Sequence, residues 1–482
     1  MKKSITLNGV YKLALNLFRF TLPALIIPYV YRTLSPDNIG SVNYAESIYS
    51  YFNALAVLGL SFYAIRELGK VRSNRLKSSF LFSNIFTINI LLVTFSLFLY
   101  LLLIFFVIKD PKVQIISLVL ALKLFLLAFD IEWVNESHED YKFISIKTML
   151  CRSVSLILMF FLITSSDNYL IYVWLNVFFD LINALFSFYY IVFYKKRVFF
   201  SFKLVRLNKL FSHFKRIAST LFLVDVGFLF FAFDKVALGA FVSNTEVAYF
   251  ALSEKIIVLV VVISSTITQV TLPRLSILAK TNRTEFLLLI NKIYTSLMMI
   301  VLPSFIGVYL MASEFLFIFG SYEFMPALDT IKIFSFYILF FSLLKILATQ
   351  TLFALNKEKV YIILLIAFAL VNAIVKLVFQ ESINSSISIL ITLSLLLLMS
   401  IIIYFHIRNK EKIKIPIINK NICIYITGCL PMFFIPFLRE HIHNVFIFSI
   451  LSMIFSIFSY TIVLLFFKES ISQSLIKKIL KR

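Results

Sequence analysis

Apolar segments close to the length of a membrane span recur along the whole chain, with short polar breaks between them. A helix needs about 20 apolar residues to cross the hydrocarbon core of a bilayer. The chain is 61% hydrophobic and 15% charged, whereas a soluble domain carries roughly 25% charged residues. A water-soluble core could not bury this much apolar surface, so the sequence predicts that the chain folds in lipid.

The apolar segments are predicted to be helices. Only helices and closed barrels satisfy their backbone hydrogen bonds in lipid, and these segments lack the alternating pattern of barrel strands. The first span is expected to stay attached, because Lys12 and Arg19 lie within it and no small-residue cleavage site follows. The predicted fold is an all-α integral membrane protein with about fourteen transmembrane helices, covering residues 10–34, 41–63, 80–108, 114–134, 143–164, 169–194, 217–242, 247–272, 290–312, 327–353, 360–378, 385–407, 421–438 and 445–467.

The basic residues are distributed unevenly over the polar segments. If the N-terminus is cytoplasmic, the inside segments hold about 31 Lys and Arg residues, whereas the outside loops hold three, Lys109, Lys112 and Arg439. Basic residues resist translocation, so a multi-pass topology with both termini cytoplasmic is expected. A net charge of +22 spread over many short segments does not indicate a nucleic-acid partner.

An internal repeat indicates two halves. At a constant offset of 208, residues of similar type recur without gaps: Ser35 and Ser243, Ile39 and Val247, Glu46 and Glu254, Ile48 and Ile256, Arg66 and Arg274. Parallel repeats of this kind are typical of transporters built from two like halves. The predicted organisation is an N-lobe over 1–194, a basic cytoplasmic linker over 195–216, a C-lobe over 217–407, and two further spans with a basic cytoplasmic tail over 408–482.

Charges inside the predicted spans indicate a wet cavity. A charged side chain at mid-bilayer costs about 2.5–3.5 kcal/mol, so each needs a partner, a cavity or a position near a span end. Lys12, Arg32, Lys147, Arg152 and Lys376 lie near span ends and are expected to extend to the headgroups. Six other cations are less easily explained by a position near a span end. They are predicted to line a cavity between the halves and to bind substrate there: Arg19, Lys123, Lys235, Lys255, Lys332 and Lys345.

Acidic residues inside the spans are candidates for coupling to an ion gradient. Lys123 and Asp130 are seven residues apart and are expected to share a helix face, with Glu132 pointing away. Coupling to H⁺ or Na⁺ is a hypothesis that rests on Glu46, Asp130, Asp225, Asp234 and Glu254. No resident cofactor and no metal site are expected, because the three cysteines lack ligand spacing. No GxxxxGK[ST] loop is present, so ATP hydrolysis by the chain is not predicted.

Four regions resemble the Wzx-type polysaccharide repeat-unit flippases of the MOP (multidrug/oligosaccharidyl-lipid/polysaccharide) exporter superfamily, which have a fold like that of MATE transporters. They are residues 22–74, which begin LPALIIPYVYRTLSPDNIGSVNYAES; DIEWVNESHEDYKFISIKT at 130–148; FDKVALGAF at 233–241 followed by SNTEVAYFALSEKI; and LPRLS at 272–276. The chain departs from the resemblance at Asn135–Ser137, where relatives commonly have a glutamine-glycine turn.

The resemblance implies two six-helix lobes plus two extra C-terminal helices. It further implies a location in the bacterial cytoplasmic (inner) membrane. There the chain would move an undecaprenyl-pyrophosphate-linked oligosaccharide to the outer leaflet for O-antigen, capsule or teichoic acid assembly, with a polymerase and other glycan assembly proteins as candidate partners. Such proteins are not enzymes but secondary transporters. The cationic lumen implied for this chain would include Arg19, Lys123, Lys235, Lys255 and Lys345.

Two other functions fit parts of the sequence. A membrane-embedded glycan polymerase or ligase would handle similar substrates, but it would need an external catalytic loop, and the longest outside loop, about 313–326, offers only Glu314 and Glu323. A multidrug or small-molecule antiporter of the same fold is the second alternative. Its cationic substrates favour an acidic, aromatic pocket, whereas the predicted spans carry more bases than acids.

Overall fold

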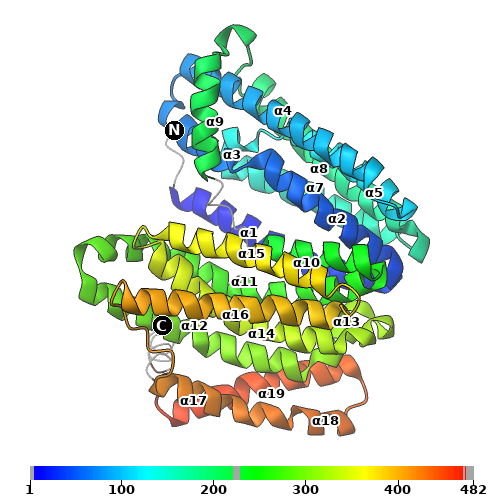
Figure 1. Cartoon of the computed structure of the whole chain (residues 1–482), viewed down its shortest axis with the longest axis vertical. Helices are drawn as coiled ribbons and strands as arrows, with labels where there is room; N and C mark the ends of the chain where they lie inside the picture. Colours follow the sequence, from blue (N-terminus) through cyan, green and yellow to red (C-terminus); the bar gives the residue numbers. More distant parts are fainter. Residues whose placement is uncertain (1–4, 221–227, 470–472, 474–482) are drawn as a thin grey trace. The chain divides into compact units, whose positions relative to one another are not determined.

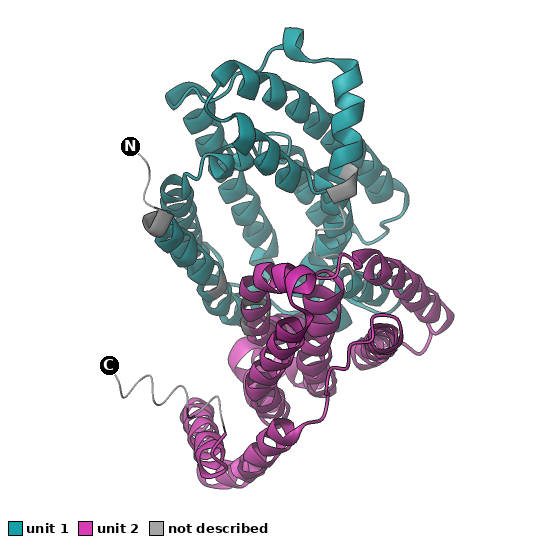
Figure 2. Ribbon diagram, turned by 90° about the vertical axis from the view of Figure 1, so that its left-hand side faces the viewer, with its two compact units in different colours: residues 1–248 teal, residues 249–482 magenta. Residues whose placement is uncertain are grey.

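The computed structural model describes residues 5–220, 228–469 and 473. Every regular element in these ranges is helical, which confirms the predicted all-α class. The chain divides into two compact units, residues 1–248 and 249–482 (Figure 2). The lobe boundaries predicted from the sequence remain predictions.

Unit 1 is a bundle in which α2 occupies a central position, because α2 packs against α4, α5, α8 and α10 (Figure 1). Its helices are α1 (Ile5–Thr33), α2 (Pro36–Val57), α3 (Leu60–Val71), α4 (Arg75–Phe106), α5 (Pro111–Leu126), α6 (Glu132–Ser137), α7 (Tyr141–Leu162), η1 (Ser166–Asn168), α8 (Tyr169–Tyr189), η2 (Tyr190–Tyr194), η3 (Phe202–Leu204), α9 (Leu207–Thr220) and α10 (Phe228–Phe241).

Unit 2 receives most of α11 (Asn244–Thr281), which begins in unit 1. Within it α14 packs against both α12 and α16, while α17 and α19 pack together beside α12. The other helices are α12 (Arg283–Leu310), α13 (Ala312–Gly320), η5 (Tyr322–Ala327), α14 (Leu328–Leu344), η6 (Lys345–Leu352), α15 (Glu358–Val378), α16 (Ser385–Asn409), α17 (Lys420–Cys429), η7 (Leu430–Phe434), α18 (Ile435–His441) and α19 (Val445–Phe466).

Eleven helical segments in the described residues are long and apolar enough to cross a membrane. The other three spans predicted from the sequence fall on α5, α10 and α11, which are not among the eleven. The helix α5 has 16 residues, which by itself is shorter than the roughly 20 residues that a span requires. Residues 221–227 of the predicted span 217–242 lie outside the described residues. The architecture is therefore that of a multi-pass membrane protein, and the number fourteen remains a prediction.

Local chemistry explains where several helices begin and end. The Ser35 hydroxyl caps α2 by accepting a hydrogen bond from the Asn38 N–H, and Pro36 occupies the first turn. The predicted span 41–63 is broken because Leu58 and Gly59 take left-handed backbone angles, with φ of 41° and 74°. The chain therefore restarts as a separate helix, α3, at Leu60.

The start of α11 repeats the start of α2. The Ser243 hydroxyl accepts from the Glu246 N–H at 3.2 Å, as Ser35 does for α2. Ile39 and Val247, which correspond at the offset of 208, are both fully buried. The residues that match in sequence thus have the same local structure, as an internal repeat would produce.

Candidate functional site

Charged side chains from α5, α7 and α8 meet inside unit 1. The Asp180 carboxylate on α8 contacts the Lys123 ammonium at 3.1 Å and the Arg152 guanidinium at 2.5 Å. The Lys123 Nζ also lies 5.6 Å from the centre of the Tyr49 ring on α2. One carboxylate between two cations leaves the cluster with a net positive charge, and all three charged side chains are partly exposed. The cluster is therefore accessible and favours an anion.

A second charged cluster is more deeply buried. The Lys147 ammonium on α7 pairs with the Glu132 carboxylate on α6 and donates to the Ser187 hydroxyl and, at 3.2 Å, to the Asn183 carbonyl on α8. Ser187 in turn donates to Glu132 at 2.6 Å. The Lys147 side chain is 5% exposed. Each charge thus has a partner, as a buried ion pair requires.

The expectation that Lys147 extends to the headgroups is wrong, and so is the expectation for Lys376. The Lys376 side chain on α15 is fully buried and donates to the Thr392 hydroxyl on α16 at 2.8 Å. Both lysines lie near a helix end, but a neighbouring helix supplies oxygen acceptors inside the unit. Distance from a span end therefore did not determine the direction of these side chains.

The expected common face of Lys123 and Asp130 is also wrong. The helix α5 ends at Leu126, and the chain turns before α6 begins at Glu132. Residues on either side of this break do not follow one helical period. Asp130 instead accepts a hydrogen bond from the Glu132 N–H at 3.2 Å, and Glu132 faces Lys147.

The segment Asn135–Ser137, where the chain departs from the family pattern, forms the end of α6. A third cluster of polar side chains holds this segment in place. Arg197, which follows η2, pairs with Asp140 and donates to the Asn135 side chain at 2.6 Å. Tyr190 donates to the same Asp140 carboxylate at 2.9 Å. Asn135 therefore has a defined role here: it accepts a hydrogen bond from the segment that follows α8.

The remaining predicted substrate cations are distributed over both units. In unit 1, Arg19 is exposed on α1 and Lys235 is partly buried on α10. In unit 2, Lys255 on α11 is partly buried, Lys332 on α14 lies 5.8 Å from the centre of the Tyr309 ring, and Lys345 lies 4.9 Å from the centre of the Phe341 ring. Lys123 belongs to the charged cluster at Asp180. The predicted cavity between the halves remains a prediction.

The predicted coupling acids have different surroundings. Asp234 on α10 is fully buried, whereas Glu46 on α2 and Glu254 on α11 are partly buried. Asp225 lies outside the described residues. Asp130 lies in the turn before α6, next to the Lys147–Glu132 pair.

Unit 2 contains an apolar groove of about 650 Å³ between α12, α19 and their neighbours. Its wall includes Met299, Pro303 and Gly307 from α12, Met432 from η7 and Tyr460 from α19. The Tyr460 hydroxyl donates to the Met299 carbonyl at 2.8 Å. Because the Tyr460 hydroxyl is already hydrogen-bonded, the groove presents hydrocarbon, thioether and aromatic surface to an occupant.

Sequence reasoning noted the charges in the spans but missed how they combine. Asp180 is the residue that joins α5, α7 and α8, yet no helical period connects it to Lys123 or Arg152. The available signal was that one predicted span contains an acid, Asp180, and two others contain the bases Lys123 and Arg152. This signal does not show which charged residues pair with each other.

The family described as Polysaccharide biosynthesis protein matches residues 5–279. No curated protein sequence matches the chain. Among solved structures, the lipid II flippase MurJ in an inward closed conformation is similar with a TM-score of 0.75 and 14% identity, over 96% of this chain and 99% of that one. An outward-facing multidrug resistance MATE transporter of the MOP superfamily is similar with a TM-score of 0.56 and 14% identity, over 85% and 94%. The chain therefore has the fold of these transporters.

Proposed function

The chain belongs to the polysaccharide biosynthesis protein family, and on this premise we propose that it is a flippase for lipid-linked oligosaccharide. The observation that carries the proposal is the family match over residues 5–279. This range contains four of the six predicted substrate cations: Arg19, Lys123, Lys235 and Lys255. The substrate we propose is an undecaprenyl-pyrophosphate-linked repeat unit for O-antigen, capsule or teichoic acid assembly.

The proposed substrate has a diphosphate that cannot cross hydrocarbon without fixed partners. Ammonium and guanidinium groups in a wet groove would replace its hydration with charge-assisted hydrogen bonds. The net positive cluster of Lys123, Arg152 and Asp180 has the sign that such a headgroup needs. Because Asp180 already neutralises part of the charge, the cluster would attract the diphosphate without retaining it permanently.

The lipid tail of the substrate needs a separate apolar surface. The groove between α12 and α19 has a volume of about 650 Å³, within the roughly 300–1,000 Å³ of small-molecule sites. We assign it to a segment of the polyisoprenyl tail. Methionine side chains line it, and they adapt to irregular hydrocarbon more readily than branched residues do.

The energy for transport would come from an H⁺ or Na⁺ gradient. Glu46, Asp130, Asp225, Asp234 and Glu254 are the candidate coupling residues, and Asp130 lies beside the buried Lys147–Glu132 pair. A carboxylate that gains or loses a cation next to such a pair would change the balance of charges inside unit 1. Alternating access between two lobes would then move the headgroup across the membrane.

The likeness to a multidrug MATE transporter supports one alternative function, export of small molecules. That function would need an acidic pocket for cationic substrates. The charged cluster in unit 1 instead has two bases for one acid. We therefore favour the anionic, lipid-linked substrate.

Substitution of the predicted substrate cations tests the proposal in cells. Arg19→Ala and Lys123→Ala are expected to abolish surface polysaccharide while normal amounts of protein reach the membrane. Arg19→Lys, which keeps the charge, should retain part of the export. Lys410→Ala is the matched control, because Lys410 is exposed in the polar segment after α16. Normal export by both alanine variants would refute the cationic substrate site.

A further inference from the structure

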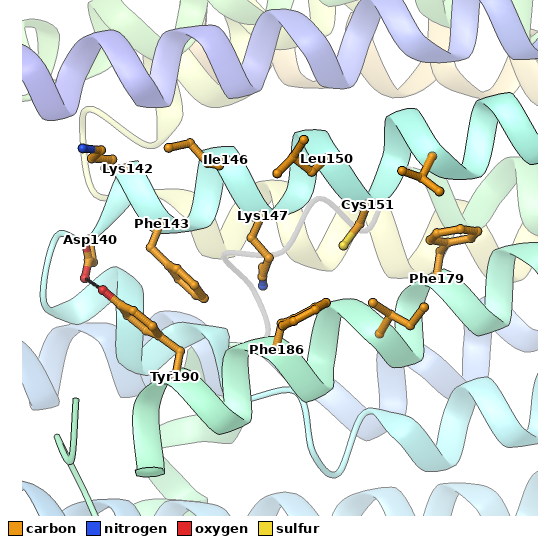
Figure 3. Close-up of a pocket in the computed structure, with 12 residues that line it drawn as sticks. Asp140, Lys142, Phe143, Ile146, Lys147, Leu150, Cys151, Phe179, Phe186 and Tyr190 are labelled. Carbon is orange, nitrogen blue, oxygen red and sulfur yellow. Dashed lines mark hydrogen bonds between the residues drawn. The ribbon is translucent and has the colours of Figure 1, made fainter. Parts of the chain in front are cut away.

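A second groove runs along the seam between α7 and α8 in unit 1. Its volume is about 680 Å³. Figure 3 shows Lys142, Asp140 and Tyr190 at one end and Phe179 toward the other, with Phe143, Lys147 and Cys151 directed from α7 toward α8. The walls between these ends are almost entirely apolar.

The groove is open along its length. Leu150 on α7 is 61% exposed and Phe186 on α8 is 55% exposed, so large apolar side chains of both walls remain uncovered within unit 1. On membrane-spanning helices such side chains face lipid hydrocarbon, which is as apolar as leucine, so the walls of the groove suit an acyl chain. The substrate clusters described above do not use these two side chains.

The dimensions of the groove match one leaflet of a bilayer. Its lining on α7 runs from Lys142 to Val154, which at 1.5 Å per residue is roughly 18 Å. Half of the bilayer hydrocarbon core is about 15 Å. A single acyl chain lying along α7 would therefore extend from the polar end of the groove to the middle of the membrane.

The polar end of the groove favours a negatively charged headgroup. Lys142 is exposed at this end, and the Lys195 ammonium lies 5.6 Å from the centre of the Tyr190 ring. The acid at the same end, Asp140, is paired with Arg197 and accepts a hydrogen bond from Tyr190. With Asp140 neutralised by Arg197, the charge that an incoming headgroup meets is positive.

We propose that the α7–α8 groove binds one anionic glycerophospholipid, with its phosphate at Lys142 and an acyl chain along the apolar walls. The bound lipid would cover the seam that contains the Lys147–Glu132 pair and so stabilise the packing of α7 on α8. The inference rests on the proposed function in one respect: the predicted orientation places Lys142 at the cytoplasmic leaflet. It does not depend on which glycan is transported.

Lipid retention by the purified full-length chain tests the proposal. In native mass spectrometry, phosphatidylglycerol should be retained in preference to phosphatidylcholine with the same acyl chains. Lys142→Gln is expected to lower this preference about five-fold, the contribution of one lysine to the binding of anionic lipid. Lys196→Gln is the matched control, because Lys196 is exposed next to Lys195 but does not line the groove. Equal retention of the two lipids, or equal effects of the two substitutions, would overturn the proposal.

Protection of a cysteine in the groove from alkylation tests where the lipid binds. Cys151 lines the groove and is partly exposed, Cys423 is exposed elsewhere and Cys429 is buried. In a Cys423→Ser background, phosphatidylglycerol should slow alkylation of Cys151 and phosphatidylcholine should not. Protection by a polyisoprenyl phosphate that also displaces phosphatidylglycerol would assign the groove to the substrate tail and contradict the proposal. Neither experiment measures transport, so loss of lipid binding and loss of flipping are separate outcomes.

Discussion

Lys147 shows how a charge inside a membrane protein is accommodated. Its ammonium has three oxygen partners from two neighbouring helices, and its side chain is 5% exposed. The free energy of such a pair depends on both partners, because removing one leaves an uncompensated buried charge. The Lys147 ammonium is therefore satisfied by oxygen atoms of the protein and needs no water molecule as long as Glu132 and Ser187 remain in place.

Substitution of one partner is therefore expected to be more harmful than substitution of both. Glu132→Gln leaves the Lys147 ammonium without a carboxylate and should lower the free energy of unfolding by about 3–5 kcal/mol, whereas the double variant Glu132→Gln/Lys147→Met should recover most of the loss. Thermal unfolding in detergent measures both.

The matched control is a pair at the surface. Arg72 and Glu139 contact at 2.8 Å with side chains 43% and 53% exposed, so Arg72→Met should cost at most about 1 kcal/mol. If Arg72→Met and Glu132→Gln lower the unfolding temperature equally, the buried pair does not have the role described.

His213 makes the attachment of α9 sensitive to pH. Its ring nitrogen is hydrogen-bonded to the Tyr63 hydroxyl on α3 at 2.6 Å. Burial lowers the pKa of the His213 imidazole below its usual 6.5, and the positive charges of Arg216 and Lys209 lower it further. The packed helix therefore binds this proton at a lower pH than a detached helix does, so the stabilisation is complete above pH 6.5 and is lost as the pH falls below it.

Hydrogen exchange of the α9 amides tests this pH dependence. After correction for the intrinsic rate, exchange should be faster at about pH 5.5 than at about pH 7.5, and His213→Gln, which cannot be protonated in this range, should remove the difference. An unchanged pH dependence in the variant would show that another group is responsible.

Sequence reasoning at the residue scale identified which spans carry charge but not which charges meet. Asp180 contacts Lys123 and Arg152 although the three lie in different helices. Partner choice depends on the rotation of each helix about its axis, and a single helical period says nothing of its neighbours. For the same reason the sequence could not predict that the Lys376 ammonium would donate a hydrogen bond to the Thr392 hydroxyl on α16.

At the scale of elements, α2 is held by close backbone contacts in unit 1. A Cβ atom at Gly40 would lie 1.8 Å from the Asn244 carbonyl oxygen, and one at Gly239 would lie 2.5 Å from the Tyr44 ring. Both positions therefore require glycine for lack of space rather than for backbone freedom. They bring α10 and the first residue of α11 against α2.

Gly40→Ala is expected to destabilise the chain, because a backbone carbonyl cannot move aside as a flexible side chain can. Overpacking of this kind typically costs about 1–3 kcal/mol. Gly69→Ala is the control, because no atom lies within 4 Å of the added methyl group in α3, and alanine is more stable than glycine in a helix. Equal unfolding temperatures for the two variants would contradict the tight contact.

Element positions were the part of the fold that the length of the apolar segments predicted best. The predicted spans 80–108, 143–164 and 385–407 correspond to α4, α7 and α16. The predicted span 41–63 lies within the apolar segment Pro36–Val71, but the left-handed angles at Leu58 and Gly59 divide this segment into α2 and α3. A single glycine in an apolar run did not distinguish a helix break from a helical glycine.

At the scale of the whole molecule, the uneven distribution of basic residues predicts one orientation. In a background without native cysteines, Lys109→Cys should react with a membrane-impermeant thiol reagent in intact cells. Lys203→Cys, in the basic segment before α9, should react only after the membrane is permeabilised. The opposite pattern would reverse the orientation and place the α7–α8 groove in the outer leaflet.

Flippase function requires movement of a negatively charged, lipid-linked headgroup across the membrane. The direct measurement uses proteoliposomes that contain the purified chain and a fluorescent undecaprenyl-pyrophosphate-linked oligosaccharide, with an impermeant quencher outside. The predicted result is that the quencher reaches nearly all of the label when the chain and an H⁺ or Na⁺ gradient are present, that Arg19→Ala stops this movement, and that collapse of the gradient slows it. Quenching that stays at the level of protein-free liposomes would contradict the flippase function.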